Sequence, residues 1–140
     1  MNIDFARKIE LAYHMQCKKI CKQFDLKQTG FDILMFLANN PQYNHARDIV
    51  EVRKLKANLV SIHIDQLVND GYLSRVNVKG DRRKIKLVLN EKANEVILAG
   101  KSFQENFLEE IFKDIDDVHL NIFKEVLKEM DKNLDKLMEE

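Results

Sequence analysis

Lysine and arginine residues concentrate between residues 53 and 86 of this 140-residue chain. The stretch holds nine Lys and Arg residues against three Asp, a local charge of +6 in a protein whose formal net charge is +0. Duplex DNA carries about one negative charge per ~1.7 Å of axis, so a basic face gains affinity by releasing counterions from the phosphates. The chemistry predicted for this stretch is therefore nucleic-acid binding.

Acidic residues concentrate at the other end of the chain. Residues 105–140 contain twelve Asp and Glu residues but only five Lys, a charge of −7. We expect this segment to point away from DNA, with most of its charges on a solvated helix face.

The basic stretch is predicted to fold as a helix followed by a hairpin. KANLVSIHIDQLVND has helical apolar periodicity, and Gly71 is suited to end that helix. The strand YLSRVNV, the tight turn KGDRRK and the strand IKLVLN follow. A short helix, HARDIVEV, precedes this segment with Asn44 as its predicted N-cap. Two helices joined by a short turn and followed by a basic hairpin indicate a winged helix-turn-helix.

Longer helices are predicted on both sides of this core. Apolar residues recur at steps of three and four over residues 4–24 and 91–113, and again from Asp116 or Asp117 to about residue 138. Asn90 is the predicted N-cap of the second of these helices, and one more helix is expected from Thr29 to Asn39. Because one short chain cannot bury all these apolar stripes, we expect a homodimer with a two-fold axis.

The run LVSIHIDQLVNDGYLSRVNVKGDRRKIKLVLNEKANEV resembles the signature region of the MarR family of bacterial transcription regulators. The matching residues are Ser61, Asp65, Leu67, Gly71, Tyr72, Arg75, Asp81, Arg82, Arg83, Leu89, Glu91 and Lys92. Departures are Asn90 in place of Thr, Ala93 in place of Gly, and a wing that is a few residues shorter than most.

The resemblance implies a mainly α fold with a small β-wing (α+β), and a single MarR-like domain over residues 1–140. Its winged helix-turn-helix core would span about residues 27–90, with dimerisation helices at about 4–24 and 91–138. It also implies that the helix beginning near Lys56 enters the major groove and that the wing touches the minor groove of a pseudo-palindromic operator.

Side-chain chemistry assigns separate roles within this expected interface. Asn58 could contact adenine, Lys56 could reach guanine or phosphate, and Ser61 could serve a base or the backbone. Arg82 and Arg83 suit a narrow minor groove, with Asp81 able to orient one guanidinium. The expected phosphate contacts are Arg53, Lys54, Arg75, Lys79 and Lys84. For Arg75, holding the base of the wing is an equal alternative.

Two cysteines, Cys17 and Cys21, lie four residues apart in the first predicted helix. As residues i and i+4 they are too far apart for an unstrained disulfide. We interpret them as free thiols that pack, with a redox-sensing role as the alternative. His14 joins them on one helix face, yet its ~10.5 Å rise from Cys21 prevents all three from binding one ion. No metal or cofactor is therefore predicted, unless the partner chain, His45 or His119 completes a site.

Catalysis is not expected, because the sequence contains neither a nucleophile-and-base arrangement nor a glycine-rich phosphate loop. The N-terminus does not resemble a signal peptide and no apolar run is long enough to cross a bilayer, so we expect a cytoplasmic protein without a membrane partner. Ordinary core packing is the first interpretation of several aromatic residues expected near the junction of the dimer helices and the winged helix. The family resemblance implies, as the alternative, that a small aromatic or amphipathic effector binds among these aromatic residues. These are Phe5, Tyr13, Phe31, Phe36, Tyr43, Phe103 and Phe107.

The leading interpretation is a dimeric, sequence-specific DNA-binding regulator, a repressor released by a small molecule or another signal. One alternative is a winged-helix module that binds protein or RNA, and another is a thiol- or metal-dependent variant of the same regulator. The sequence does not specify the operator, the effector, the regulated genes, or whether the protein represses or activates.

Overall fold

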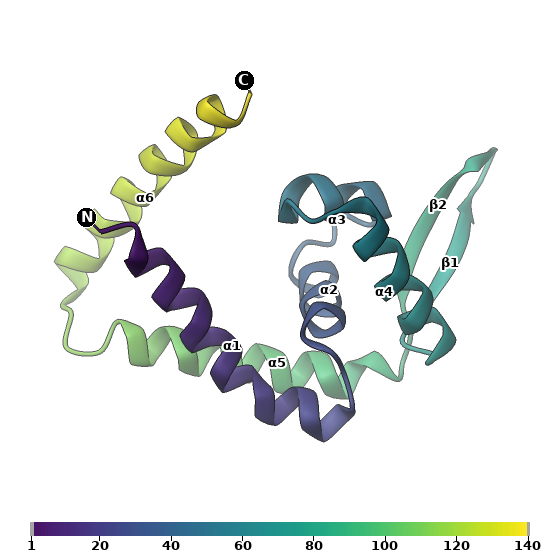
Figure 1. Ribbon diagram of the computed structural model, residues 1–140, viewed down its shortest axis with the longest axis horizontal. Helices are drawn as coiled ribbons and strands as arrows, with labels where there is room; N and C mark the ends of the chain where they lie inside the picture. Colours follow the sequence, from purple (N-terminus) through teal and green to yellow (C-terminus); the bar gives the residue numbers. More distant parts are fainter. Residues whose placement is uncertain (1, 140) are drawn as a thin grey trace. The chain divides into compact units, whose positions relative to one another are not determined.

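The computed structural model describes residues 2–139, apart from the side chain of Arg82 (Figure 1). It confirms the predicted fold class of a mainly helical protein with a two-stranded wing. The elements in order are α1 (Asp4–Phe24), α2 (Gln28–Asn39), α3 (Ala46–Arg53), α4 (Ala57–Asn69), β1 (Leu73–Val78), β2 (Asp81–Leu89), α5 (Ala93–Ile111) and α6 (Asp117–Met138). The chain divides into two compact units, Met1–Gln104 and Glu105–Glu140.

Helix α2 is the centre of the first unit. Seven of its twelve residues are buried, so it has no broad polar face and must be covered on several sides. It packs against α1, α4 and β2. On α5, Gly100 approaches α2 so closely that an added Cβ would lie 2.3 Å from the sulfur of Met35. The buried residues around this helix form the core that fixes the position of α4; the largest include Phe31, Leu34, Ile49, Ile64, Leu67 and Leu73.

The starts of two helices differ from the predictions. His45, not Asn44, is the N-cap of α3, and its backbone N–H donates to Asp48 Oδ2 at 3.0 Å. The carbonyl of Asn44 instead accepts a 2.7 Å hydrogen bond from Leu87 N in β2. Asn90 does not cap α5, which begins only at Ala93. The side chain of Asn90 instead hydrogen-bonds at the base of the wing, and this tertiary contact outweighs its local capping preference.

Asn90 closes the base of the wing. Its Nδ2 donates to the carbonyl of Gly71 at 3.0 Å, and its Oδ1 accepts from Ser74 Oγ at 2.8 Å. Gly71 has φ +85°, a left-handed conformation that favours glycine and turns the chain from α4 into β1. The predicted helix stop at Gly71 is thus confirmed.

The hairpin turn is tighter than KGDRRK suggested. β2 begins at Asp81, so Lys79 and Gly80 form the tip between the antiparallel strands. The register passes from Asn77 opposite Ile85 to Val78 opposite Asp81, which leaves three basic residues of β2 in a bulge, Arg82, Arg83 and Lys84. Bulges break strand pairing and redirect side chains.

The second unit contains the end of α5 and all of α6. Asp116, one of the two aspartates at which this helix was expected to begin, is the N-cap of α6, and its carboxylate accepts from His119 N at 2.8 Å. The rings of Phe112 and Phe123 pack edge to face with centroids 5.8 Å apart. No described residue of α6 is buried, and its exposed apolar residues include Val118, Ile122, Val126, Leu127, Leu134 and Leu137. Among the described residues, no helix is long and apolar enough to span a membrane.

Candidate nucleic-acid interface

Helix α4 presents one face to the core and another to solvent. Val60, Ile64 and Leu67 are almost completely buried. The opposite face is exposed and carries Asn58, Ser61, Ile62 and Asp65. In Figure 1, α4 lies between α3 and the two strands, and it contacts both α3 and β1.

Two expected DNA-binding residues lie where α3 gives way to α4. Lys54 ends α3 in a left-handed conformation, with φ 55°, and Lys56 is the N-cap of α4. Both are exposed. The positive end of the α4 dipole adds to their charge, so an anion near the start of this helix is stabilised.

Asn58 and Ser61 are exposed one turn apart, as a base-reading role requires. The Oδ1 of Asn58 accepts a 2.9 Å hydrogen bond from Leu59 N. Ser61 and Arg75 line an apolar hollow of about 360 Å³ between α3, α4 and the wing, together with Val50, Val60, Ile64 and Leu87.

Arg75 forms an ion pair and hydrogen bond with Asp65 of α4. This places its guanidinium over the outward face of α4, which fits the alternative that Arg75 secures the wing. The side chain retains 39% exposure, so it remains accessible from solvent. The same pair also offsets the negative charge of Asp65, the only acidic residue in α4.

Several of the residues predicted to contact DNA lie at the tip of the wing. Lys79 precedes Gly80 at the turn, and Arg83 and Lys84 are exposed in the bulge. The carboxylate of Asp81 accepts from the backbone N–H of Arg83 at 2.9 Å, a contact that shapes the bulge. The predicted contact of Arg82 falls on a side chain outside the described part of the structure.

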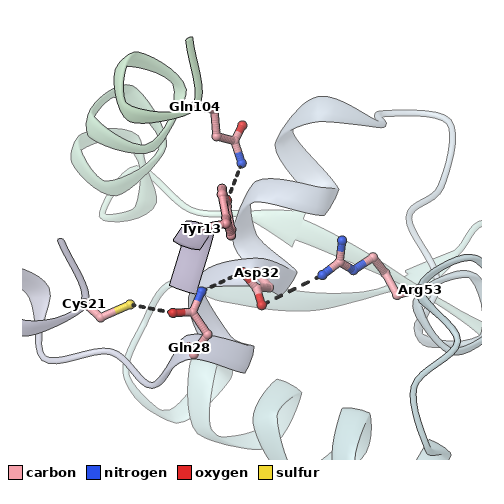
Figure 2. Close-up of polar contacts among 6 residues, drawn as sticks. All are labelled: Tyr13, Cys21, Gln28, Asp32, Arg53 and Gln104. Carbon is pink, nitrogen blue, oxygen red and sulfur yellow. Dashed lines mark hydrogen bonds and ion pairs between the residues drawn. The ribbon is translucent and has the colours of Figure 1, made fainter. Parts of the chain in front are cut away.

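Arg53 is held by a residue that the sequence did not indicate. Its Nη2 lies 3.8 Å from Asp32 Oδ2, and Gln28 Nε2 donates to Asp32 Oδ1 at 2.9 Å (Figure 2). Burial raises the pKa of Asp32, while the Gln28 hydrogen bond and the Arg53 charge act in the opposite direction. Asp32 therefore links α2 to the end of α3, directly before the turn that leads into α4.

Further contacts fix the wing relative to the helices. The Nδ1 of His45 lies 2.8 Å from the carbonyl of Ile85, to which it can only donate. Lys92 donates to the carbonyl of Asp70 at 2.5 Å, and its ammonium group lies 4.5 Å from the centre of the Tyr72 ring. No local pattern in the sequence indicated these contacts, except that Lys92 and Tyr72 belong to the motif that resembles the MarR family.

The two cysteines lie in surroundings that favour the thiol form. Cys17 is fully buried, and burial raises its pKa. Burial, followed by the influence of Cys17 and Asp32, raises the pKa of Cys21 to about 11. Cys21 Sγ lies 3.9 Å from Gln28 Oε1, as Figure 2 shows. In the described part of the chain, no three His, Cys, Asp or Glu side chains are grouped to hold a metal ion.

The predicted aromatic residues occupy different surroundings. Phe31 and Phe36 belong to the core, whereas Phe5 is exposed. Tyr13 packs against Phe103 with ring centroids 5.3 Å apart, and its hydroxyl accepts from Gln104 Nε2 at 2.9 Å. Burial raises the pKa of Tyr13 to about 12, so its hydroxyl is protonated at neutral pH.

Tyr43 and Phe107 are the other two aromatic residues expected near an effector site. Tyr43 stacks on Phe36 with centroids 6.0 Å apart. Phe107 belongs to the second compact unit. An effector site near these residues stays a prediction.

Residues 24–84 match the sequence model of the MarR family. No curated protein shows significant sequence similarity to the chain. Among solved structures, the transcriptional regulator PA3341 has 20% identity and a TM-score of 0.84, with coverage of 95% of this chain and 97% of that one. A SlyA-like transcription regulator from Listeria monocytogenes has 18% identity and a TM-score of 0.83, with coverage of 96% and 89%.

A structure of the S. aureus MepR–DNA complex is also similar. The two proteins have 18% identity and a TM-score of 0.62, with coverage of 91% of this chain and 96% of that one. These likenesses establish a shared fold along nearly the whole chain. The family match runs from the end of α1 to the bulge of the wing, so the winged helix-turn-helix part of this chain is similar to the MarR family, and the chain shares its fold with these solved structures.

Proposed function

We propose that the protein is a homodimeric, sequence-specific DNA-binding regulator that represses transcription until a small molecule or another signal releases it from a pseudo-palindromic operator. In this role α4 enters the major groove and the wing reaches the adjacent minor groove. The protein acts without catalysis, in the bacterial cytoplasm.

One observation carries the proposal: α4 has an exposed polar face, and exposed basic residues lie at the start of this helix and in the wing that follows it. Asn58 and Ser61 can hydrogen-bond to base edges, whereas the surrounding lysines and arginines can bind only phosphates or act as point charges. The basic residues at the start of α4 and in the wing lie in one compact unit with that face; they are Lys54, Lys56, Lys79, Arg83 and Lys84. The fold shared with a protein whose DNA complex has been solved adds support.

Dimer formation is supported by apolar surface that this chain leaves exposed. On α6, Val118 and Leu137 are each 68% exposed, and no described residue of the helix is buried. A stripe of this kind is typical of a helix that packs against another helix. A two-fold axis would then present two α4 helices to two half-sites.

Selection of bound duplexes from a random DNA pool, using the full chain, tests the proposal. We expect an enriched site with two inverted half-sites about one or more helical turns apart, and binding that weakens as salt concentration rises. Enrichment of no sequence, with binding to structured RNA or to protein instead, would support the interaction-module alternative. A reporter gene carrying the selected site then distinguishes repression from activation.

A further inference from the structure

Helix α4 lacks the residues that read guanine in the major groove. Between Ala57 and Asn69 the sequence has no lysine or arginine, which are the side chains that commonly bind guanine O6 and N7. Lys56 is available, but only at the N-cap. His63 is half-buried, and burial together with the charge of Lys27 lowers its pKa, so it does not supply a cation at neutral pH.

Several polar side chains of α4 are already engaged within the protein. Gln66 donates to both carboxylate oxygens of Asp70 at 3.1 Å, and Asp65 pairs with Arg75. The part of the outward face near the start of the helix therefore offers Ser61, Ile62 and Asn58. The Oδ1 of Asn58 accepts a hydrogen bond from Leu59 N, but an amide oxygen has a second lone pair that can accept another.

Ile62 is 63% exposed at the middle of this outward face. From the 100° step of an α-helix, it lies opposite the buried stripe formed by Val60, Ile64 and Leu67. A single exposed apolar side chain is common on protein surfaces and carries no meaning alone. Here it stands one turn after Asn58, on a helix without cations, where a DNA-reading helix would meet base edges.

We propose that α4 reads A·T base pairs and that Ile62 determines this specificity by packing against the C5-methyl group of thymine. Asn58, one turn earlier, would recognise adenine. The two positions are separated by ~6 Å of helix rise, comparable to about two base steps of 3.4 Å. The inference rests on the proposed function, because it names the DNA sequence that the same interface recognises.

The wing is compatible with the same class of sequence. Narrow minor grooves occur in A-tracts, and their strong negative potential attracts arginine. Arg83 is exposed in the bulge next to the wing tip. A half-site with A·T pairs under α4 and an A·T-rich flank under the wing would suit both elements.

Replacement of single thymines by deoxyuridine in the selected site provides the test, because the replacement removes one methyl group and leaves the base-pairing edges unchanged. At either member of one symmetry-related pair of thymines, we expect the single replacement to weaken binding by the parent protein about three- to fivefold, the effect of returning one buried methyl group to water. Ile62→Ala should bind the thymine site more weakly and lose this sensitivity. Asn58→Ala, the matched control on the same face, should weaken binding yet keep the sensitivity.

A second measurement requires no protein variant. Where cytosine replaces that thymine, 5-methylcytosine should restore binding relative to cytosine by a similar factor. The inference is overturned if G·C pairs occupy the positions under α4, if no thymine methyl affects binding, or if Ile62→Ala retains the full methyl effect. A protein that selects no DNA sequence at all overturns the proposed function as well, whereas a selected palindrome without methyl sensitivity overturns only the role of Ile62.

Discussion

Arg75 in β1 pairs with Asp65 in α4 and joins the wing to the helix that we propose to enter the major groove. Both side chains are more than a third exposed, so the pair should contribute only about 0.2–1 kcal/mol to folding stability. Its larger consequence is electrostatic, because a carboxylate without this partner would face DNA phosphates.

Single and double substitutions of this pair separate two roles for Arg75. If it offsets Asp65 and contacts phosphate, Arg75→Ala should weaken DNA binding about tenfold, equivalent to ~1.4 kcal/mol. Asp65→Ala should bind as well as the parent or more tightly, and the double variant should fall between the two. Equal losses in all three variants would instead mean that the pair serves only to position the wing. Titrations of labelled duplex at fixed ionic strength decide between these outcomes.

Asp32 should make stability depend on pH. Its folded-state pKa is raised above the ordinary value of 3.8, chiefly by burial, so the native state binds a proton more readily than the unfolded chain does. The free energy of unfolding therefore falls as pH rises from the pKa of Asp32 in the unfolded chain through its pKa in the folded protein. Above the folded-state pKa, this loss of stability is complete.

Asp32→Asn mimics the protonated form and can still accept the hydrogen bond from Gln28. The variant should have a higher free energy of unfolding than the parent at pH 7, and this advantage should shrink as pH falls toward the acidic range. Urea unfolding at a series of pH values measures it. Asp135→Asn, at an exposed position of α6, serves as the control and should change stability little. A parent-like pH profile for Asp32→Asn would contradict the burial argument.

Elements with a repeating side-chain pattern were predictable from the sequence. The bounds of α1 and α6 agree closely with the expected residues 4–24 and 117–138, because apolar spacing and an aspartate N-cap are local signals. Gly71 marked the end of α4 for the same reason. The basic hairpin was also recognisable, although its bulge depends on strand register, which single-residue preferences do not fix.

Contacts between distant residues were not predictable. Asp32 gave no local sign that it would face Arg53, and Tyr13 gave none that it would accept a hydrogen bond from Gln104. Asn90 has the side chain of a good N-cap, yet this side chain hydrogen-bonds to the carbonyl of Gly71 and the hydroxyl of Ser74 instead of capping a helix. In each case the partner is determined by packing around α2 or by the path of the wing.

Asn58 and Lys79 should differ in the way they support DNA binding. Asn58→Ala should cost ~1–3 kcal/mol on the preferred site and relax the preference at one base pair, as expected for a base contact. Lys79→Ala should weaken all sequences about equally and reduce the salt slope by about one unit. Binding to specific and scrambled duplexes over a range of salt concentrations compares the two variants, and identical behaviour would refute the assignment.

The apolar stripe of α6 should be required for dimer formation. Leu127 and Leu134 are 43% and 52% exposed and lie two turns apart on one side of the helix. Replacing both by Asp should produce monomers that bind the operator about a hundredfold more weakly, because the two half-sites no longer act together.

Light scattering and DNA titration of the Leu127→Asp, Leu134→Asp double variant measure both effects. Lys132→Asp changes the net charge by the same two units at a position away from the stripe, so it should remain dimeric. A parent protein that is monomeric at micromolar concentration would contradict the dimer proposal.

The two thiols should not control DNA binding. The pKa of Cys21 is raised to about 11, so only roughly one molecule in ten thousand carries its thiolate at pH 7, and the burial that raises the pKa of Cys17 also limits its access to oxidants. The parent protein and a Cys17→Ala, Cys21→Ala double variant should therefore bind DNA equally well with and without mild hydrogen peroxide. Thermal unfolding of the double variant serves as the control for any packing defect at Cys17. Release of DNA by the peroxide-treated parent, but not by the double variant, would show that a thiol senses oxidation despite its surroundings.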